Sequence, residues 1–128
     1  MTTGNAYPQQ HSVPNVYEVT SLFACAGTTL NMTKVYGNGI ASVVRTADGK
    51  FTVTFTPGFF GAALLHAEVE VHTVAAAAPL KAKVNWATYS ASAGTVDIEV
   101  WDLATPSLAI PASTAKCCLN FKFIKTTS

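Results

Sequence analysis

Histidine and glutamate alternate along one short segment of this chain, at His66, Glu68, Glu70 and His72. Imidazole nitrogens and carboxylate oxygens are common zinc ligands. On a β-strand these four side chains would share one face, but they would leave it about 6.5–7 Å apart. Because a metal site needs ligands that converge from several elements, the row favours a solvated or subunit-contacting face, paired with Lys81 and Lys83 of the following strand. We therefore expect no metal and no other cofactor.

Other catalytic patterns are weak. Asp97 and Glu99 stand two residues apart, like the paired carboxylates of glycoside hydrolases, yet strand alternation explains both. The serines and the three histidines are not accompanied by a Gly-x-Ser-x-Gly motif. The segment Gly37-Asn38-Gly39 lacks the rest of a phosphate-binding loop and is typical of a turn. We therefore expect no enzymatic activity.

The three cysteines, Cys25, Cys117 and Cys118, form neither a zinc spacing nor a disulfide framework. Neighbouring residues of a strand point to opposite faces, so one of the adjacent pair is expected in the core and the other on the surface. An intermolecular disulfide is the functional alternative, and it requires oxidising conditions after assembly.

Three aromatic residues, Trp86, Tyr89 and Trp101, suggest a platform that stacks on sugar rings. Trp86 falls on the apolar register of its segment and is expected in the core. Trp101 alternates with Asp97 and Glu99 and is expected to point outward. An outward tryptophan is more often an interface anchor, and coverage by the chain's own N-terminal segment is the other possibility.

Alternation of apolar and polar residues around these positions predicts an all-β protein. The strongest signal is a hairpin at residues 43–56, in which Thr46-Ala47-Asp48-Gly49 supplies the turn and Phe51, Val53 and Phe55 share one face. A second hairpin is predicted from residues 80–89 and 95–102, with its turn at residues 90–94.

A long strand is predicted over residues 63–74, and its inward residues are expected to be Leu65, Ala67, Val69 and Val71. Residues 16–23 and 117–125 complete a set of roughly seven or eight strands without a helix. This set indicates a single-domain antiparallel β-sandwich or jelly-roll-like barrel over residues 16–128.

Residues 1–15 contain two prolines and no periodicity, and they are predicted to form an extended N-terminal arm. Such an arm is either disordered or ordered by a neighbour. Tyr7, Val13 and Val16 are apolar anchors in this otherwise polar part of the chain, suited to strand addition or wrapping. Phe59 and Phe60 stand in a short loop without an obvious core to enter. The sequence therefore predicts partner contacts in the arm and this loop.

Charged groups are scarce, because 12% of the residues are charged, 49% are hydrophobic and the formal net charge is +1. This balance gives no reason to expect a nucleic acid or a membrane surface as partner, and it permits close association of like subunits. No secretory signal and no stretch of about 18 apolar residues is present, so we expect synthesis in a cytoplasm.

The first hairpin resembles a segment of small virion proteins of tailed bacteriophages. In this chain it is Gly39-Ile-Ala-Ser-Val-Val-Arg-Thr-Ala-Asp-Gly-Lys-Phe-Thr-Val-Thr-Phe55, and Leu119-Asn-Phe-Lys-Phe-Ile124 adds a similar closing strand. Similar segments occur in head decoration (cement) proteins and in tail-fibre domains. The likeness covers residue 37 to the C-terminus, while Phe59-Phe60 and the adjacent cysteines depart from the pattern.

The resemblance implies a structural protein on the capsid exterior, made in the host bacterial cytoplasm. Its homodimers or homotrimers would bridge subunits of the major capsid protein and stabilise the phage head. The expected contacts are Tyr7, Val13, Phe59, Phe60 and Trp101. The same fold would serve a tail-fibre domain that binds a receptor or glycan, and this alternative stays open.

Overall fold

The computed structural model of the chain describes residues 16–26, 31–72, 80–103, 107–109, 111 and 115–124. The predicted arm at residues 1–15, with Tyr7 and Val13, lies outside the described residues. Within the described part, no helix is long and apolar enough to cross a membrane.

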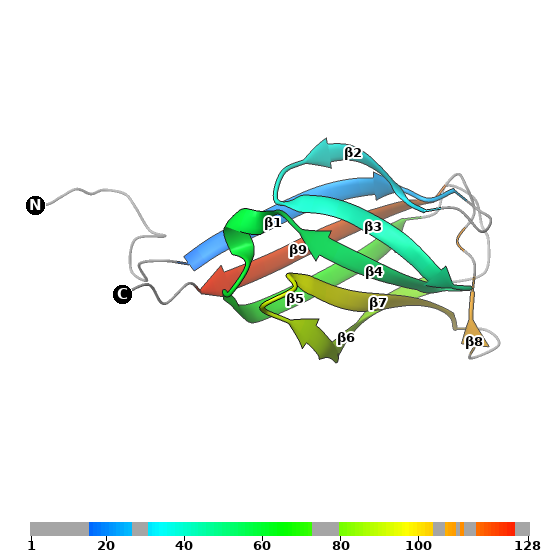
Figure 1. Cartoon of the computed structure of the whole chain (residues 1–128). Helices are drawn as coiled ribbons and strands as arrows, with labels where there is room; N and C mark the ends of the chain where they lie inside the picture. The colour runs from blue at the N-terminus through cyan, green and yellow to red at the C-terminus, as the bar shows by residue number, and fades with distance from the viewer. Residues whose placement is uncertain are drawn as a thin grey trace, which may run out of the picture.

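The described residues form two antiparallel β-sheets packed against each other (Figure 1), which confirms the predicted all-β sandwich. The β9 sheet has the strand order β2-β1-β9-β5. The β7 sheet has the order β3-β4-β7-β6, and β8 pairs with one end of β7. The strands are β1 (Val16–Ala24), β2 (Thr33–Gly37), β3 (Ile40–Ala47), β4 (Lys50–Phe55), β5 (Ala63–His72), β6 (Leu80–Ser90), β7 (Thr95–Asp102), β8 (Ser107–Leu108) and β9 (Lys116–Ile124), with the 3₁₀ turn η2 (Pro57–Phe59) between β4 and β5.

The core lies between the sheets and follows the period-two alternation of the strands. On β9, the inward residues Cys117, Leu119, Phe121 and Phe123 are fully buried, and so are Val96, Ile98 and Val100 on β7. The predicted hairpin forms between β3 and β4, with Phe51, Val53 and Phe55 buried and Gly49 at a φ of 73° in its turn. Both predictions from alternation are therefore confirmed here.

One side of the sandwich, here called the closed side, consists of β2, β3 and the segment Gly37-Asn38-Gly39 between them. β2 is not among the predicted strands, although Thr33-Lys34-Val35-Tyr36 contains strand-type residues. The chain passes from the β9 sheet to the β7 sheet at this segment, and the Met32 N–H donates to the Val43 carbonyl at 3.2 Å. A backbone crossover and a bridge therefore join the two sheets here.

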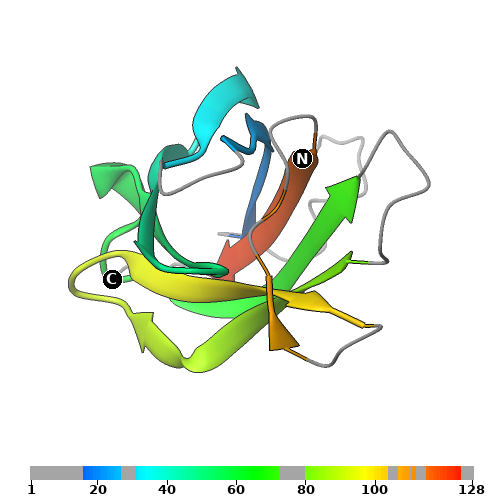
Figure 2. The ribbon, with the colours of Figure 1, turned by 90° about the vertical axis from the view of Figure 1, so that its right-hand side faces the viewer.

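The opposite side, here called the open seam, lies between β5 and β6, the last strands of their sheets. Among the described residues, β5 pairs only with β9 and β6 only with β7. The end-on view in Figure 2 shows β2 (cyan) and β6 (yellow-green) on opposite sides of the shared interior. In the described residues, a single isolated bridge between Met32 and Val43 joins the two sheets, and it lies on the closed side.

The prediction that Leu65 faces inward is wrong. The register of β5 against β9 shifts between Leu64 and His66, and this bulge leaves Leu65 49% exposed. Leu64 packs against the core instead, followed by Ala67, Val69 and Val71 as predicted. A bulge inserts one extra residue, so the face of every residue before it changes.

Trp86 is also not a core residue, contrary to prediction, because it is 47% exposed. The pairing of β6 with β7 is interrupted between Asn85 and Ser90. The Thr88 hydroxyl closes this bulge: it donates to the Asn85 carbonyl at 2.7 Å and accepts the Asp97 N–H at 2.8 Å. Tyr89, rather than Trp86, then packs against the core.

Candidate functional site

The outer face of the β7 sheet carries ordered rows of polar and aromatic side chains. Glu99 of β7 lies between Lys50 of β4 and Lys83 of β6 in the strand register, and Trp101 lies beside Lys81. Since Val96, Ile98 and Val100 fill the inward positions of β7, Trp101 occupies the outward face, as predicted. Opposite charges on neighbouring strands stabilise such a surface modestly.

Trp101 is held by a hydrogen bond and lies between residues of two neighbouring strands. Its indole Nε1 donates to Glu99 Oε1 at 3.0 Å, and the residue is partly buried. The backbone register places Leu108 of β8 on one flank and Lys81 of β6 on the other. The ring is therefore positioned by the fold before any partner arrives.

An open groove of about 430 Å³ lies along this ring, and its lining residues are Lys81, Ala82, Lys83, Trp101, Asp102 and Leu103. Leu103 is 54% exposed although it is large and apolar. Lysine side chains cover apolar surface with their methylene stems and keep the ammonium group in water. The groove thus combines an apolar floor with a charged rim, and we call it the Trp101 groove.

The sequence did not predict that Lys81, Lys83 and Leu103 join Trp101. The hairpin of β6 and β7 is predicted, but the bulge at residues 86–89 decides which residues of β6 lie opposite Trp101. A hairpin that continued from the Ser90–Thr95 pair without a bulge would place Val84 opposite Trp101. The structure places Lys81 there. The sequence signal that was present is a large apolar residue, Leu103, directly after the strand predicted at residues 95–102.

The carboxylates considered for hydrolysis are both engaged within the fold. Thr52 Oγ1 donates to Asp97 Oδ1 at 2.7 Å, and Glu99 accepts the Trp101 hydrogen bond. Both lie on the outer face of β7. Asp97 holds the side chain of Thr52 on the neighbouring strand β4, and Glu99 holds that of Trp101 on β7. Both carboxylates thus fix the positions of other side chains on this face.

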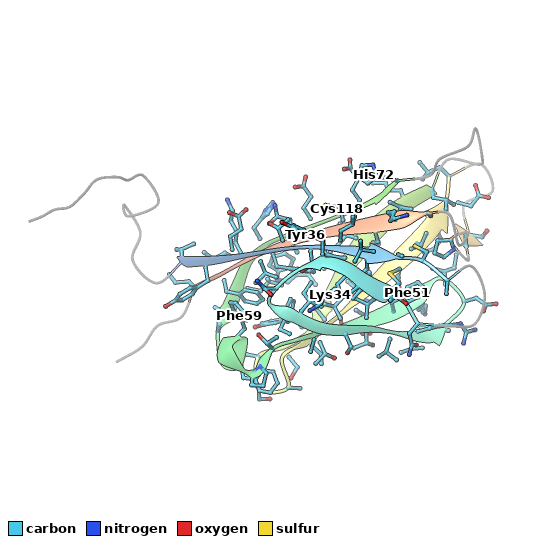
Figure 3. The ribbon with its side chains drawn as sticks, turned by 90° about the horizontal axis from the view of Figure 1, so that it is seen from above. Lys34, Tyr36, Phe51, Phe59, His72 and Cys118 are labelled. Atoms are coloured by element: carbon cyan, nitrogen blue, oxygen red, sulfur yellow. The ribbon has the colours of Figure 1, made fainter. Side chains whose placement is uncertain are left out.

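The row from His66 to His72 lies on the outer face of the β9 sheet, as predicted, but its expected partners are wrong. Lys81 and Lys83 are on β6 in the other sheet, and the row instead faces the outward residues Lys116, Cys118, Asn120 and Lys122 of β9. Figure 3 shows His72 and Cys118 on these neighbouring strands. His72 Nε2 lies 3.0 Å from Glu70 Oε1, and both side chains are exposed. Among the described residues, no three His, Cys, Asp or Glu side chains cluster as metal ligands.

Phe59 packs against the hydrophobic core, contrary to expectation. Its ring centroid lies 5.1 Å from that of Phe123 and 6.4 Å from that of Tyr17, at the end of the sandwich formed by η2 (Figure 3). Phe60 stays 38% exposed and covers Gly94, where an added Cβ would lie 2.3 Å from its ring. Of this loop, only Phe60 offers substantial apolar surface to a partner.

The adjacent cysteines divide between the two faces of β9 as predicted. Cys117 is buried and Cys118 is partly exposed, while Cys25 is buried near the end of β1. Burial raises the pKa of Cys25 to about 11. Burial, together with the neighbouring Cys25 and Cys118 thiols, raises the pKa of Cys117 as well. Both buried thiols therefore stay protonated at neutral pH and serve as small apolar core groups.

No protein-family model matches this chain, and no curated protein or solved structure matches it.

Proposed function

We propose that this chain is a structural assembly protein without catalytic function, and that it binds another protein surface through the Trp101 groove. The observation that supports this most is the fixed Trp101 ring, which stands on an outer face and is held by Glu99 at 3.0 Å. A ring that is positioned in advance loses little entropy on binding. Tryptophan is also enriched among the residues that dominate interface energy.

The specific form that we propose is a head decoration (cement) protein of a tailed bacteriophage, on the capsid exterior. The resemblance of residues 39–55 and 119–124 to such virion proteins supports it, as does the low charge. The partners would be the major capsid protein and further copies of this chain. Many interfaces of about 800 Å² per partner would act together, so symmetry and avidity supply the affinity.

Localisation on virus particles tests this form directly. Particles from the source culture would be banded by density and labelled with an antibody against the chain, then viewed by electron microscopy. We expect even label over the heads. Label confined to tail tips would favour a fibre domain, and absence of the chain from purified particles would overturn both forms.

The arm is expected to contribute contacts through Tyr7 and Val13, and Phe60 to add apolar area. Deletion of residues 1–15 is expected to lower capsid occupancy and the temperature at which the heads release their genome. Unchanged values for both would remove the arm from the proposal while leaving the Trp101 groove.

A glycan-binding domain is the second candidate, because the Trp101 ring lies in an open groove beside Lys81 and Lys83. Aromatic rings stack on sugar faces while polar groups bind hydroxyls. A glycan array would test it with Trp101→Ala and, as matched control, Tyr36→Ala, since the aromatic Tyr36 is exposed on β2 but lies outside the groove. Saturable binding lost only in Trp101→Ala would favour this candidate over the capsid protein.

A further inference from the structure

The open seam presents two unpaired strand edges next to each other. β5 and β6 each pair on one side only, and each has a bulge in its pairing with its inner neighbour, β9 or β7. Unpaired edges carry free N–H and C=O groups, which are templates for another chain. β2 and β3 are also the end strands of their sheets, but at the open seam the two edges run side by side, and no bridge joins them in the described residues.

A groove of about 360 Å³ runs along the seam. Residues from both edges line it: Glu68, Val69, Glu70, Val71, Leu80, Lys81, Ala82 and Leu103. It shares Lys81, Ala82 and Leu103 with the Trp101 groove, so the two hollows are continuous. Aliphatic side chains and polar groups both line it, and its two rims carry charged residues.

The two rims carry opposite charges. Glu68 and Glu70 stand on the β5 rim, and Lys81 stands on the β6 rim with Lys83 two residues further on. A two-fold axis along the seam, parallel to the strands, places the β5 rim of one copy against the β6 rim of the other. Such an axis repeats the acid–base contact twice, as a self-complementary interface requires.

Exposed apolar side chains lie on the same strands and at the edge of the groove. Leu65 of β5 is 49% exposed, Trp86 of β6 is 47% exposed, and Leu103 is 54% exposed. The bulges of the two strands turn the first two outward. Large apolar residues beside complementary charges are typical of protein interfaces.

We infer that the open seam binds a second copy of this chain as a two-fold symmetric dimer, in which Glu68 and Glu70 of each copy face Lys81 and Lys83 of the other. This inference rests on the proposed assembly function. It assigns the surface through which the proposed homo-oligomer forms. Leu103 in the groove, with the exposed Leu65 and Trp86 further along β5 and β6, would supply the apolar contact.

Charge reversal on the full chain tests the inference. One variant carries Glu68→Lys and Glu70→Lys, and the other carries Lys81→Glu and Lys83→Glu. Each variant alone would set like charges against each other, and we expect its dimer dissociation constant in sedimentation equilibrium to rise at least about tenfold. Circular dichroism would establish that both variants fold.

An equimolar mixture of the two variants gives the decisive result. Every cross-contact is then acid against base, so we expect a mixed dimer by native mass spectrometry with nearly wild-type affinity. The control Lys34→Glu with Lys50→Glu changes the net charge as the second variant does, on strands away from the seam, and is expected to dimerise normally.

Three results would overturn the inference: a monomeric wild-type chain, a trimer, or no mixed dimer. A monomer would mean that the charges and bulges protect the edges from association. Phage heads labelled by a monomeric chain would overturn only the seam dimer. A seam dimer absent from virus particles would overturn only the capsid proposal.

Discussion

At the closed side the chain crosses directly from one sheet to the other through Gly37-Asn38-Gly39, whereas at the open seam β5 and β6 lie next to each other unpaired. The crossover packs on β1: the Ser21 hydroxyl donates to the Asn38 carbonyl at 3.3 Å, and a Cβ added at Gly39 would lie 2.7 Å from the Val19 side chain. The seam instead carries exposed Leu65, charged rims and a groove.

This difference suggests that folding and association depend on different sides of the sandwich. At the closed side, Gly37 and Gly39 of the crossover leave no room for a Cβ beside β1, so substitutions at these glycines should act on the free energy of unfolding. Side chains that reach into solvent form the seam, and surface substitutions generally change stability by about 0.5 kcal/mol or less. Substitutions at the seam should therefore act on binding.

The largest effect is expected for Gly37→Ala at the closed side. Gly37 has a φ of +110°, and an added Cβ would lie 2.5 Å from the Thr20 carbonyl oxygen. Both the left-handed backbone and the backbone clash oppose the substitution, so we expect a loss of at least about 3 kcal/mol in urea unfolding. Gly58→Ala is the matched control, because Gly58 has open space within 4 Å, and it should unfold almost normally. Equal losses in both variants would contradict this account of the crossover.

Thiol labelling tests whether the open seam admits water to the core, since Cys117 lies opposite Val71 of β5. We expect one fast thiol per chain at pH 8, from Cys118. Burial raises the pKa of Cys25 from 9.0 to about 11, so its thiolate is about a hundredfold scarcer and its reaction at least that much slower. Cys118→Ser should remove the fast phase. A second fast thiol would show that the seam is an opening into the interior.

The same shifts predict the alkaline behaviour of the fold. Because the pKa of Cys25 and Cys117 is raised in the folded chain, ionisation favours the unfolded chain. Their contribution to the free energy of unfolding is complete below pH 9.0, and that of Cys25 is lost as the pH rises through about 11. Urea unfolding across this interval should show the decline.

A smaller effect is expected at the β6 bulge beside the seam. Thr88→Val removes the hydroxyl that accepts the Asp97 N–H at 2.8 Å, which leaves that donor without its partner. Such a loss costs about 1–2 kcal/mol in the free energy of unfolding. Thr54→Val on β4 is the control, because the Thr54 hydroxyl forms no hydrogen bond within the described residues. If both variants lose equally, the bulge does not depend on Thr88.

The regular part of this fold could be predicted from the sequence, and the bulged part could not. Alternation and a glycine turn were sufficient for the β3–β4 hairpin and for the outward face of Trp101. The exposure of Leu65 and Trp86 depends on extra residues at two bulges, which change the face of a strand without changing its composition. The partners of Trp101 were missed for the same reason.

Matched substitutions on the two sides give the smallest effect on folding and the sharpest contrast in association. Leu65 of β5 and Val35 of β2 are 49% and 51% exposed on edge strands, and threonine retains strand propensity at both positions. Leu65→Thr and Val35→Thr should each change the free energy of unfolding by about 0.5 kcal/mol or less.

Only Leu65→Thr removes apolar contact area at the proposed dimer surface, so it alone should raise the dimer dissociation constant, by about threefold to tenfold. Sedimentation equilibrium would measure both variants beside the wild-type chain. Weakening by Val35→Thr alone would assign association to the closed side, where Tyr36 is 78% exposed. The comparison of the two sides would then be reversed, because the side joined by the backbone would also be the side that binds.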